Sequence, residues 1–211
     1  IRDYKVTGVQ TCALPISRTF VRPVLQAFDW IGVQSEEDLG RFAIAGFPEE
    51  RLHLMGSMKY DVADLASDNP GKGREIRRLA GWDRGQVVLL GGSTHPGEEK
   101  ALADILKELK PKHPNLRLML VPRHVERKGE ILSELSGTGL KIGLRSRLEE
   151  ERGGDPDILL VDSTGELRDL YPACELVFIG KTLTGKGGQN FLEAARHGRA
   201  IVAGPHMENF Q

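Results

Sequence analysis

Gly-Lys-Thr-Leu-Thr-Gly-Lys-Gly-Gly-Gln-Asn-Phe-Leu-Glu-Ala, residues 180–194, follows the short apolar run Leu176–Ile179. The apolar run is typical of a buried strand, and a helical pattern begins at about Gln189. The sequence therefore predicts a strand, a glycine-rich turn and a helix N-terminus. Glycines let the main chain approach a ligand closely, and the free N–H groups of a first helical turn favour an anion such as a phosphate. Glu193 would lie in the first turns of that helix, where its carboxylate could accept hydrogen bonds from a ribose diol.

The same stretch has an ordinary interpretation, a β–α loop in which Glu193 only complements the helix dipole. Two familiar phosphate motifs do not fit it. A P-loop would need a glycine where Glu175 stands, and a dinucleotide fingerprint that starts at Gly185 would place its third glycine at Asn190. The stretch therefore predicts neither ATP hydrolysis nor NAD binding.

The composition of the whole chain limits the classes of protein to which it can belong. Its 211 residues carry a formal net charge of -1, with charges of both signs intermixed, which argues against nucleic acid as the main partner. No apolar run approaches the ~18 residues that a membrane-spanning helix needs. Only two cysteines occur, Cys12 and Cys174, which excludes a disulfide framework and fits a reducing compartment.

The chain divides into four segments by composition. Residues 6–16 look like the translation of a sequencing-library adapter, so residues 1–16 are expected to be non-native, the alternative being a short native strand or signal remnant. Residues 17–60 are expected to be the C-terminal remnant of one domain, and residues 61–85 an interdomain linker. Residues 86–211 are expected to form a second domain that is incomplete at its C-terminus.

Residues 17–80 show two helix–strand pairs and then a polar segment. The expected helices are Arg18–Phe28 and one that Ser35 caps and that ends near Gly46; the expected strands are Trp30–Val33 and Leu52–Met55. Asp68–Gly73 is expected to be a loop, followed by a short helix over Glu75–Ala80.

After residue 85, apolar strands alternate with helices. The predicted strands are Gln86–Leu90, Leu116–Val121, Leu140–Leu144, Ile158–Val161, Leu176–Ile179 and Ala200–Ala203, and the predicted helices include Lys100–Leu109 and Arg127–Leu135. This alternation predicts an α/β fold with a doubly wound parallel sheet.

Polar residues follow five of these strands. They are Ser93 and Thr94, Arg123 and His124, Ser163 and Thr164, the glycine-rich stretch, and His206. Each has an ordinary explanation by itself: Ser163 with Glu166 can form a capping box, and Arg123 can be merely solvated. Ligands of open α/β sheets bind at the carboxyl ends of the strands, so the five sets together favour one crevice.

These blocks resemble the 3-deoxy-D-manno-octulosonic acid (Kdo) transferases of lipid A and lipopolysaccharide assembly. The resemblance runs from about Arg18 to the end of the chain, through residues 34–38, 56–61, 92–99, 121–124, 161–167, 187–190 and 204–210. It implies a GT-B architecture of two Rossmann-like domains, of which this chain holds the end of the acceptor domain and most of the donor domain. It also implies transfer of Kdo from CMP-Kdo to a lipid A precursor without a metal or other cofactor.

The resemblance assigns roles to particular residues. The expected donor-binding residues are Ser93, Arg123, His124, Gly187, Gly188, Gln189, Asn190 and Glu193, with Thr94, Ser163, Thr164, Lys186, His206 and Asn209 as secondary candidates. Glu98 and Glu99 are expected only to complement a helix N-terminus. No metal ligand is expected, because neither His124 nor His206 has a histidine or cysteine at ligand spacing.

The chain departs from the family pattern at four positions: Lys181 and Thr182 stand where Gly-Ser is common, and Phe191 and Ala194 stand where prolines are frequent. The family's general base and membrane anchor belong to the N-terminal part of the acceptor domain, which we expect this chain to lack. No catalytic base is therefore assigned. The full-length protein is expected at the cytoplasmic face of the bacterial inner membrane, and the fragment is expected to be soluble and inactive in transfer.

Two other functions remain open from the sequence. One is a GT-B enzyme that uses a UDP-sugar, either a transferase or an epimerase. The other is a nucleotide-binding module without catalysis. Nucleic acid is not expected as a partner.

Overall fold

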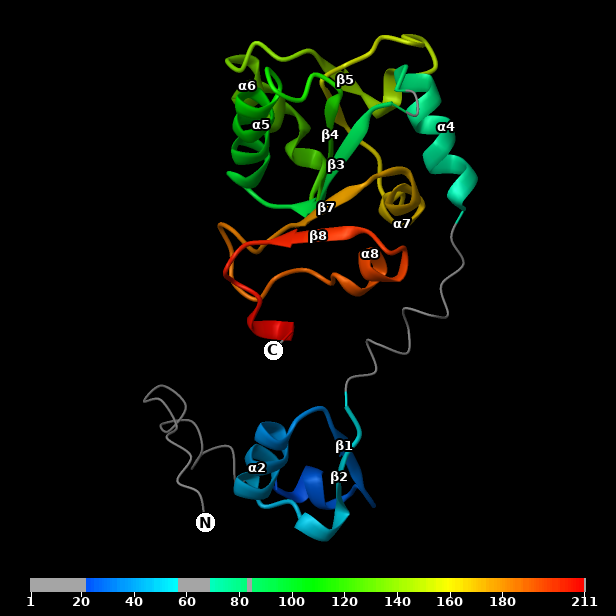
Figure 1. Ribbon diagram of the computed structural model, residues 1–211. Coiled ribbons are helices and arrows are strands. Elements are labelled where there is room, and N and C mark those ends of the chain that lie inside the picture. Colours follow the sequence, from blue (N-terminus) through cyan, green and yellow to red (C-terminus); the bar gives the residue numbers. More distant parts are fainter. Residues whose placement is uncertain (1–21, 57–68, 83–84, 211) are drawn as a thin grey trace. The chain divides into compact units, whose positions relative to one another are not determined.

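The computed structural model describes residues 22–56, 69–82 and 85–210. The chain falls into two compact units, residues 1–62 and 63–211, which we describe separately (Figure 1). The adapter-like segment 1–16 and most of the 56–61 block lie outside the described residues.

The first unit is a small α/β layer. Residues 22–26 are helical, and β1 (Ile31–Val33), α2 (Glu36–Ala45), η1 (Glu49–Arg51) and β2 (Leu52–Leu54) follow. The two strands pair in parallel, with Gly32 opposite His53. The predicted cap is confirmed, since the Ser35 hydroxyl oxygen accepts the Asp38 N–H at 3.1 Å. Leu25, Val33, Phe47 and Leu52 are buried together between the strands and the helices.

The second unit is a six-stranded parallel sheet with helices on both faces, as predicted. Its strands are β3 (Val87–Thr94), β4 (Leu116–Pro122), β5 (Ile142–Leu144), β6 (Ile158–Leu160), β7 (Leu176–Ile179) and β8 (Ala200–Ala203). Its α-helices are α4 (Pro70–Ala80), α5 (Glu98–Leu109), α6 (Lys128–Ser136), α7 (Leu167–Leu170) and α8 (Leu192–Arg196). Short 3-10 turns complete it: η2 (Val125–Arg127), η3 (Arg145–Arg147), η4 (Tyr171–Ala173) and η5 (Glu208–Phe210).

The strand order is β5-β6-β4-β3-β7-β8, and every pair is parallel. From β3 the chain adds β4 beside it, then β5 at the outer edge and β6 between β5 and β4, and it then crosses to place β7 on the other side of β3. The order therefore reverses between β3 and β7. In open α/β sheets the carboxyl ends of the strands at this reversal form the usual ligand-binding crevice.

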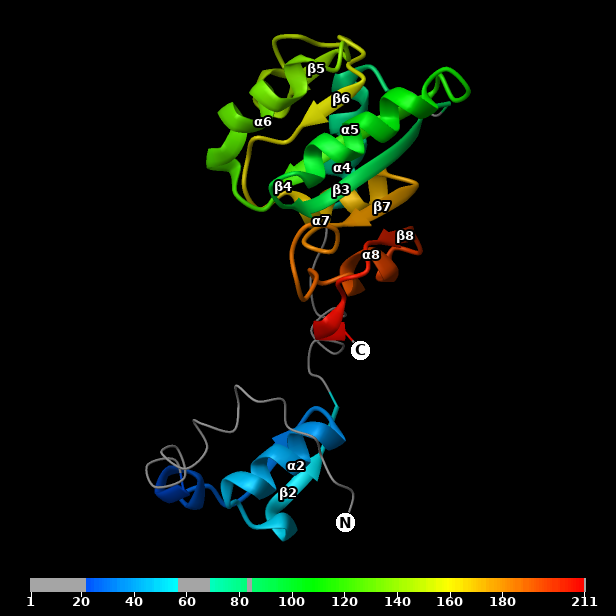
Figure 2. The same cartoon turned by 90° about the vertical axis from the view of Figure 1, so that its left-hand side faces the viewer.

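Each face of the sheet has its own core, and both are built from alternate residues of the strands. Met119 and Val121 of β4 pack with α4 and α7, whereas Leu118 and Leu120 pack with α5 and α6. Figure 2 shows α5 and α6 together on one side of the sheet. All seven residues of β4 are buried, and all are apolar except Arg117, whose guanidinium group pairs with Asp155 at 3.0 Å.

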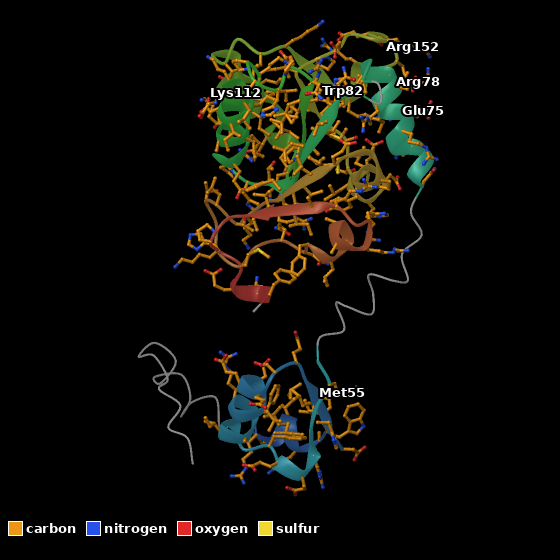
Figure 3. All side chains as sticks on the ribbon, viewed as in Figure 1. Met55, Glu75, Arg78, Trp82, Lys112 and Arg152 are labelled. Atoms are coloured by element: carbon orange, nitrogen blue, oxygen red, sulfur yellow. The ribbon has the colours of Figure 1, made fainter. Side chains whose placement is uncertain are left out.

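The segment expected to be a loop, Asp68–Gly73, is helical from Pro70 onward. Pro70 occupies the first turn of α4, where its missing N–H costs nothing. Gly73 lets α4 pack closely on α7, because a Cβ at this position would lie 2.3 Å from the Asp169 carbonyl oxygen. The polar composition thus belongs to a helix that packs on the second unit. Trp82, labelled in Figure 3, follows this helix and donates its indole N–H to the Pro156 carbonyl oxygen at 2.9 Å.

Candidate functional site

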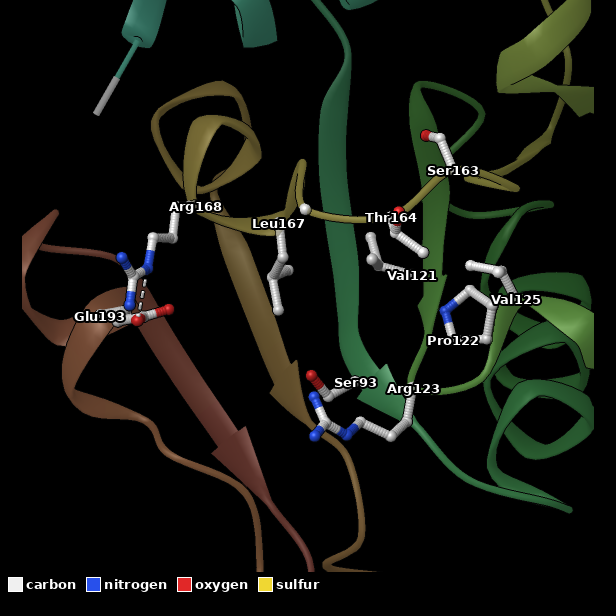
Figure 4. Close-up of a pocket in the computed structure, with 11 residues that line it drawn as sticks. Ser93, Val121, Pro122, Arg123, Val125, Ser163, Thr164, Leu167, Arg168 and Glu193 are labelled. Atoms are coloured by element: carbon white, nitrogen blue, oxygen red, sulfur yellow. Dashed lines mark hydrogen bonds and ion pairs between the residues drawn. The ribbon is translucent and has the colours of Figure 1, made fainter. Parts of the chain in front are cut away.

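A pocket of about 410 Å³ opens at the carboxyl ends of β3, β4 and β6, beside the point where the strand order reverses (Figure 4). Five predicted site residues line it, from four different segments: Ser93, Arg123, Ser163, Thr164 and Glu193. The remaining wall is formed by Val121, Pro122, Val125, Gly165, Leu167 and Arg168. The expectation that polar residues after separate strands converge is therefore confirmed for these five.

Ser93 reaches the pocket through an irregular end of β3. The pairing register of β3 with β4 shifts between Gly92 and Thr94, and Ser93 adopts a left-handed backbone with φ 53°. Gly180 at the end of β7 packs directly on this bulge, because a Cβ there would lie 2.0 Å from the Ser93 carbonyl oxygen. The bulge and the glycine together set the direction of the Ser93 side chain.

Arg123 is the free cation of the pocket. It follows the last residue of β4, and its backbone N–H donates to the Thr94 carbonyl oxygen at 3.0 Å. The side chain is exposed, and among the described residues no carboxylate pairs with its guanidinium group. A guanidinium in this state can bind a carboxylate or phosphate in two-point contact.

Glu193 lies in the first turn of α8, as expected, and its carboxylate has a partner that the sequence analysis did not include. Arg168 Nε donates to Glu193 Oε1 at 2.8 Å. The two side chains are drawn together in Figure 4. Arg168 lies on α7, after the Ser163–Glu166 loop, and only its position four residues beyond the polar pair at the end of β6 could have pointed to it. The pair leaves the second carboxylate oxygen of Glu193 available to a ligand.

The loop that carries Ser163 and Thr164 is braced from behind by Glu166. Ser163 Oγ donates to Glu166 Oε2, and Lys72 Nζ lies 3.0 Å from Glu166 Oε1. Burial raises the pKa of Glu166, but the hydrogen bonds from Ser163 and Lys72 and the charge of Arg145 outweigh it, so the net pKa is below its usual value. Glu166 is ionised at neutral pH and fixes the loop.

The glycine-rich loop does not line this pocket. Gly187 and Gly188 have φ values of 94° and 69°; Gly187 packs against Asn209 of η5, and Gly188 against Met207 just before it. The Gly187 N–H donates to Glu208 Oε2 at 2.6 Å, and the Asn209 N–H donates to the Gly187 carbonyl oxygen at 3.3 Å. A side chain of the chain itself thus holds the N–H that a phosphate would need.

The helix after the glycine-rich loop begins at Leu192, and the expected start at Gln189 is wrong. The positive φ values of the two glycines are not helical, and Asn190 Oδ1 accepts the Leu192 N–H at 3.0 Å. Gln189 instead points back to the end of β3, with its Nε2 3.3 Å from His95 Nε2. The four expected donor residues of this loop, Gly187 to Asn190, therefore precede the helix.

Comparison with known proteins identifies the family. Residues 9–62 match the family model described as 3-deoxy-D-manno-octulosonic-acid transferase (kdotransferase). Over 170 residues the chain is 32% identical to the 3-deoxy-D-manno-octulosonic acid transferase of Haemophilus influenzae, covering 81% of this chain and 39% of the relative. Over 196 residues it is 32% identical to the Chlamydophila psittaci enzyme of that name, covering 92% of this chain and 43% of the relative.

The chain belongs to the Kdo transferase family. Its structure is similar to the crystal structure of the C-terminal CMP-Kdo binding domain of WaaA from Acinetobacter baumannii, with a TM-score of 0.60 and 28% identity over 67% of this chain and 73% of that one. It also resembles Anabaena HepE in complex with UDP, with a TM-score of 0.54 and 18% identity over 98% of this chain and 54% of that one. The second likeness shows the fold alone. The GT-B type of fold is thus confirmed.

The four departures from the usual Kdo transferase pattern are accommodated. Thr182 is fully buried, and its hydroxyl oxygen accepts the Gly204 N–H at 2.8 Å. Lys181 adopts φ 60°, a conformation in which glycine would be unstrained. Phe191 packs edge-on against Phe210 with ring centroids 5.3 Å apart. Ala194, a residue of α8, is buried in the hydrophobic core.

The other predicted site residues lie outside the pocket lining. Thr94 is fully buried, and its hydroxyl donates to Glu99 Oε1 at 2.9 Å, so it supports the wall from behind. Lys186, Asn209 and His206 lie on the glycine-rich loop or the segment after β8. His124 and His206 each lie 3.3 Å from a neighbouring glutamate. Their donor contacts stay predictions.

Histidines do gather near the end of β3. The rings of His95 and His124 meet edge to face with centroids 6.2 Å apart. Burial lowers the pKa of His95, although the Glu98 carboxylate acts in the opposite direction.

Within the described ranges, no group of three or more His, Cys, Asp or Glu residues could hold a metal ion. The described helices also include none long and apolar enough to cross a membrane.

Proposed function

We propose that the protein containing this chain transfers Kdo from CMP-Kdo to a lipid A precursor, and that the pocket at the ends of β3, β4 and β6 holds the donor. The chain spans about two fifths of the length of the curated relatives it matches, 39% and 43% for the two quoted above. The activity of the whole protein therefore rests on residues outside this chain as well. The proposal includes binding at the cytoplasmic face of the inner membrane through such residues.

The observation that carries the proposal is the composition of the pocket. It combines Arg123, a cation for which the described part of the chain supplies no carboxylate partner, with Glu193, a carboxylate held by a neighbouring arginine. CMP-Kdo offers the complementary groups: a phosphate and the Kdo carboxylate are anions, and the ribose carries a diol. A guanidinium suits the anions, and a carboxylate accepts hydrogen bonds from both hydroxyls of a diol.

The proposed reaction is substitution at the anomeric carbon of Kdo. A hydroxyl of the acceptor gives up its proton to a general base outside this chain and forms the new C–O bond, while the bond from the anomeric carbon to the phosphate oxygen breaks and CMP leaves as an anion. Arg123 would stabilise the charge that develops on the departing phosphate, which is where a fixed cation contributes most. Ser93 would hydrogen-bond the phosphate or the sugar, and Ser163, whose O–H is donated to Glu166, would accept a hydrogen bond from a sugar hydroxyl. No metal or cofactor takes part in the proposed reaction.

The glycine-rich loop enters the proposal with one condition. If Gly187 to Asn190 contact the donor, the Gly187 N–H must exchange the Glu208 carboxylate for a donor oxygen. Glu208 lies on the surface and its side chain is 46% exposed, so this exchange does not require opening the core. Of these four residues, Gln189 contacts the segment after β3, because its Nε2 lies 3.3 Å from His95 Nε2.

A calorimetric titration of the chain with CMP and with UDP tests the proposal. We expect CMP to bind and UDP to bind at least ~10-fold more weakly, a difference of about 1.4 kcal/mol. Tighter binding of UDP would favour a UDP-sugar enzyme, and no binding of either nucleotide would overturn the assignment of the pocket. A transfer assay with labelled CMP-Kdo and a lipid A precursor, run on the chain and on the full-length protein, completes the test. Transfer is expected only from the full-length protein.

A further inference from the structure

Glu98 is a fully buried carboxylate at the start of α5, and both of its oxygens are bound by backbone N–H groups. Oε2 accepts from His95 and Lys181, each at 2.8 Å, and Oε1 accepts from Thr182 and Leu183, each at 3.0 Å. Three of the four donors are consecutive residues of the glycine-rich loop. Successive N–H groups that converge in this way form a nest, a common anion-binding feature of loops.

The nest lies where the strand order reverses. Glu98 belongs to the segment after β3, and its loop partners follow β7, so the carboxylate joins the two strands whose ends define the crevice. The Gly180 N–H, one residue earlier, donates to the Gly92 carbonyl oxygen at 2.8 Å. The Thr182 carbonyl oxygen accepts the His206 N–H at 3.1 Å, which adds the segment after β8. One buried charge therefore fixes the base of the loop.

The C-terminal end of the glycine-rich loop, at Gln189, also contacts the residues around Glu98. The Gln189 N–H donates to the Gly180 carbonyl oxygen at 3.2 Å, and the Gln189 side chain contacts the His95 ring. His95 is itself held through its backbone N–H by Glu98. The conformation of the loop and of the Ser93 bulge on which Gly180 packs thus depends on the Glu98 carboxylate.

We propose that Glu98 is a positioning residue for donor binding, and that its carboxylate takes the place of a ligand anion in the Lys181–Leu183 nest and holds the glycine-rich loop in its binding conformation. The coupling to the donor rests on the proposed function; the occupation of the nest does not. It follows that the N–H groups of Lys181, Thr182 and Leu183 are not the groups that bind the donor phosphate.

Glu98→Gln is a sharp test because the two oxygens are equivalent. Each accepts two N–H groups, so in either orientation the new amide NH₂ faces two donors and loses both bonds. Glu99→Gln is the matched control. Glu99 is equally buried in the same turn, its Oε1 binds Thr94 and Arg127, and its Oε2 has no hydrogen-bond partner among the residues that the structure describes, so an amide there disturbs no loop contact.

The first measurement is amide hydrogen exchange, which needs no ligand. In the wild-type chain we expect the N–H groups of Thr182 and Leu183 to be protected like those of β7, although the Leu183 side chain is 43% exposed. Glu98→Gln should abolish this protection and Glu99→Gln should preserve it. Fast exchange at both amides in the wild-type chain would overturn the proposal without any variant.

The second measurement is chemical rescue of the emptied nest. Glu98→Ala leaves four N–H groups around a carboxylate-sized space, and formate should raise its unfolding temperature by about 2–4 °C, the shift that ~1 kcal/mol gives in a chain of this size. Formate should not stabilise the wild-type chain. It should not stabilise Leu102→Ala either, because that change leaves an apolar cavity where the Leu102 side chain of α5 packs in the core. Equal effects of formate on all three chains would count against the nest.

The third measurement is the affinity for CMP. We expect Glu98→Gln to weaken binding about 10-fold and Glu99→Gln by less than about 3-fold. Loss of amide protection with unchanged CMP affinity would overturn the positioning role while leaving the proposed function intact. Failure of the wild-type chain to bind CMP would instead overturn the proposed function, and the exchange and rescue results would still decide whether Glu98 fills the nest.

Discussion

The carboxyl edge of the sheet has two sides that use their polar groups differently. On the side of β4 and β6, the groups face a pocket, and Arg123 has no carboxylate partner among the residues that the structure describes. On the side of β7 and β8, the loop N–H groups are already bound by carboxylates of the chain, at Lys181 to Leu183 by Glu98 and at Gly187 by Glu208.

This difference distinguishes the groups that can bind a ligand from the groups that hold the loop in its conformation. A group without a partner can bind a ligand at little cost, whereas a bound N–H must first release its carboxylate. The available group on the pocket side is the exposed side chain of Arg123, and the bound groups on the other side are backbone N–H groups of the glycine-rich loop. The comparison predicts that changes on the loop side alter stability, and alter affinity only through the conformation of the loop, while changes to the available pocket side chains alter affinity directly.

The largest effect is expected from Gly180→Ala. A Cβ at this position would lie 2.0 Å from the Ser93 carbonyl oxygen and 2.8 Å from the Gly92 carbonyl oxygen, so backbone must move. We expect a loss of about 3 kcal/mol or more in the free energy of unfolding, measured by urea denaturation. Gly137→Ala is the control: a Cβ there meets nothing within 4 Å, and the change should stay within about 0.5 kcal/mol. Equal stability of the two variants would contradict the close packing of β7 on the Ser93 bulge.

Sequence reasoning succeeded where local pattern decides the outcome. The apolar runs of β7 and β8 were located to the residue, and Ser93, Arg123 and Glu193 were placed at one edge because parallel strands bring their carboxyl ends together. Contacts between distant segments were missed. Glu98 resembles an ordinary first-turn acid, and only its position opposite the loop after β7 shows that it binds three N–H groups there.

Local sequence pattern also gives wrong predictions where tertiary contacts decide the conformation of a residue. Pro70 and Gly73 suggested a loop, but one begins α4 and the other permits its contact with α7. The start of α8 was placed too early because the positive φ values of Gly187 and Gly188 depend on their packing against η5 and the residues just before it. Neither the register nor the packing can be inferred from composition.

On the pocket side, Arg123→Gln should have the next largest effect. We expect CMP affinity to fall by about 1.5–3 kcal/mol, the usual value of hydrogen bonds to a charged group, with no change in unfolding temperature because the side chain is exposed. Calorimetric titration beside thermal unfolding measures both quantities. Arg147→Gln, which removes an exposed arginine outside the pocket lining, should change neither. A large loss of stability in Arg123→Gln would place this residue with the supporting groups instead.

Glu193→Gln should weaken CMP binding by about 1.5 kcal/mol, because an amide keeps one acceptor but loses the charge. The decisive comparison is CMP against its 2',3'-dideoxy analogue. If Glu193 holds the ribose diol, the variant loses affinity for CMP and keeps its affinity for the analogue. Equal losses for both nucleotides would mean that Glu193 acts only through its ion pair with Arg168, which places it on the supporting side of the comparison.

The smallest effect is expected from Lys72→Gln, which tests whether the pocket loop is supported by charge. Lys72 lies 3.0 Å from Glu166, and its side chain is 35% exposed, so we expect a loss of about 0.5–1 kcal/mol at pH 7. Lys112→Gln, an exposed lysine with no carboxylate partner among the described residues, should cause no loss.

The pH dependence of the Lys72→Gln effect has a definite sign. The pKa of Glu166 is lowered in the folded chain, so its ionised form stabilises the fold at pH values above the ordinary pKa of 4.5, and this contribution disappears as the pH falls through the lowered value. The difference between wild-type and Lys72→Gln should therefore be full at pH 7 and vanish in acid, once Glu166 is protonated in both chains. Urea unfolding at pH 7, 5 and 3 measures it. A difference that does not shrink as the pH falls would mean that Lys72 acts by packing α4 on α7, and that the Ser163 loop is held without the charge of Glu166.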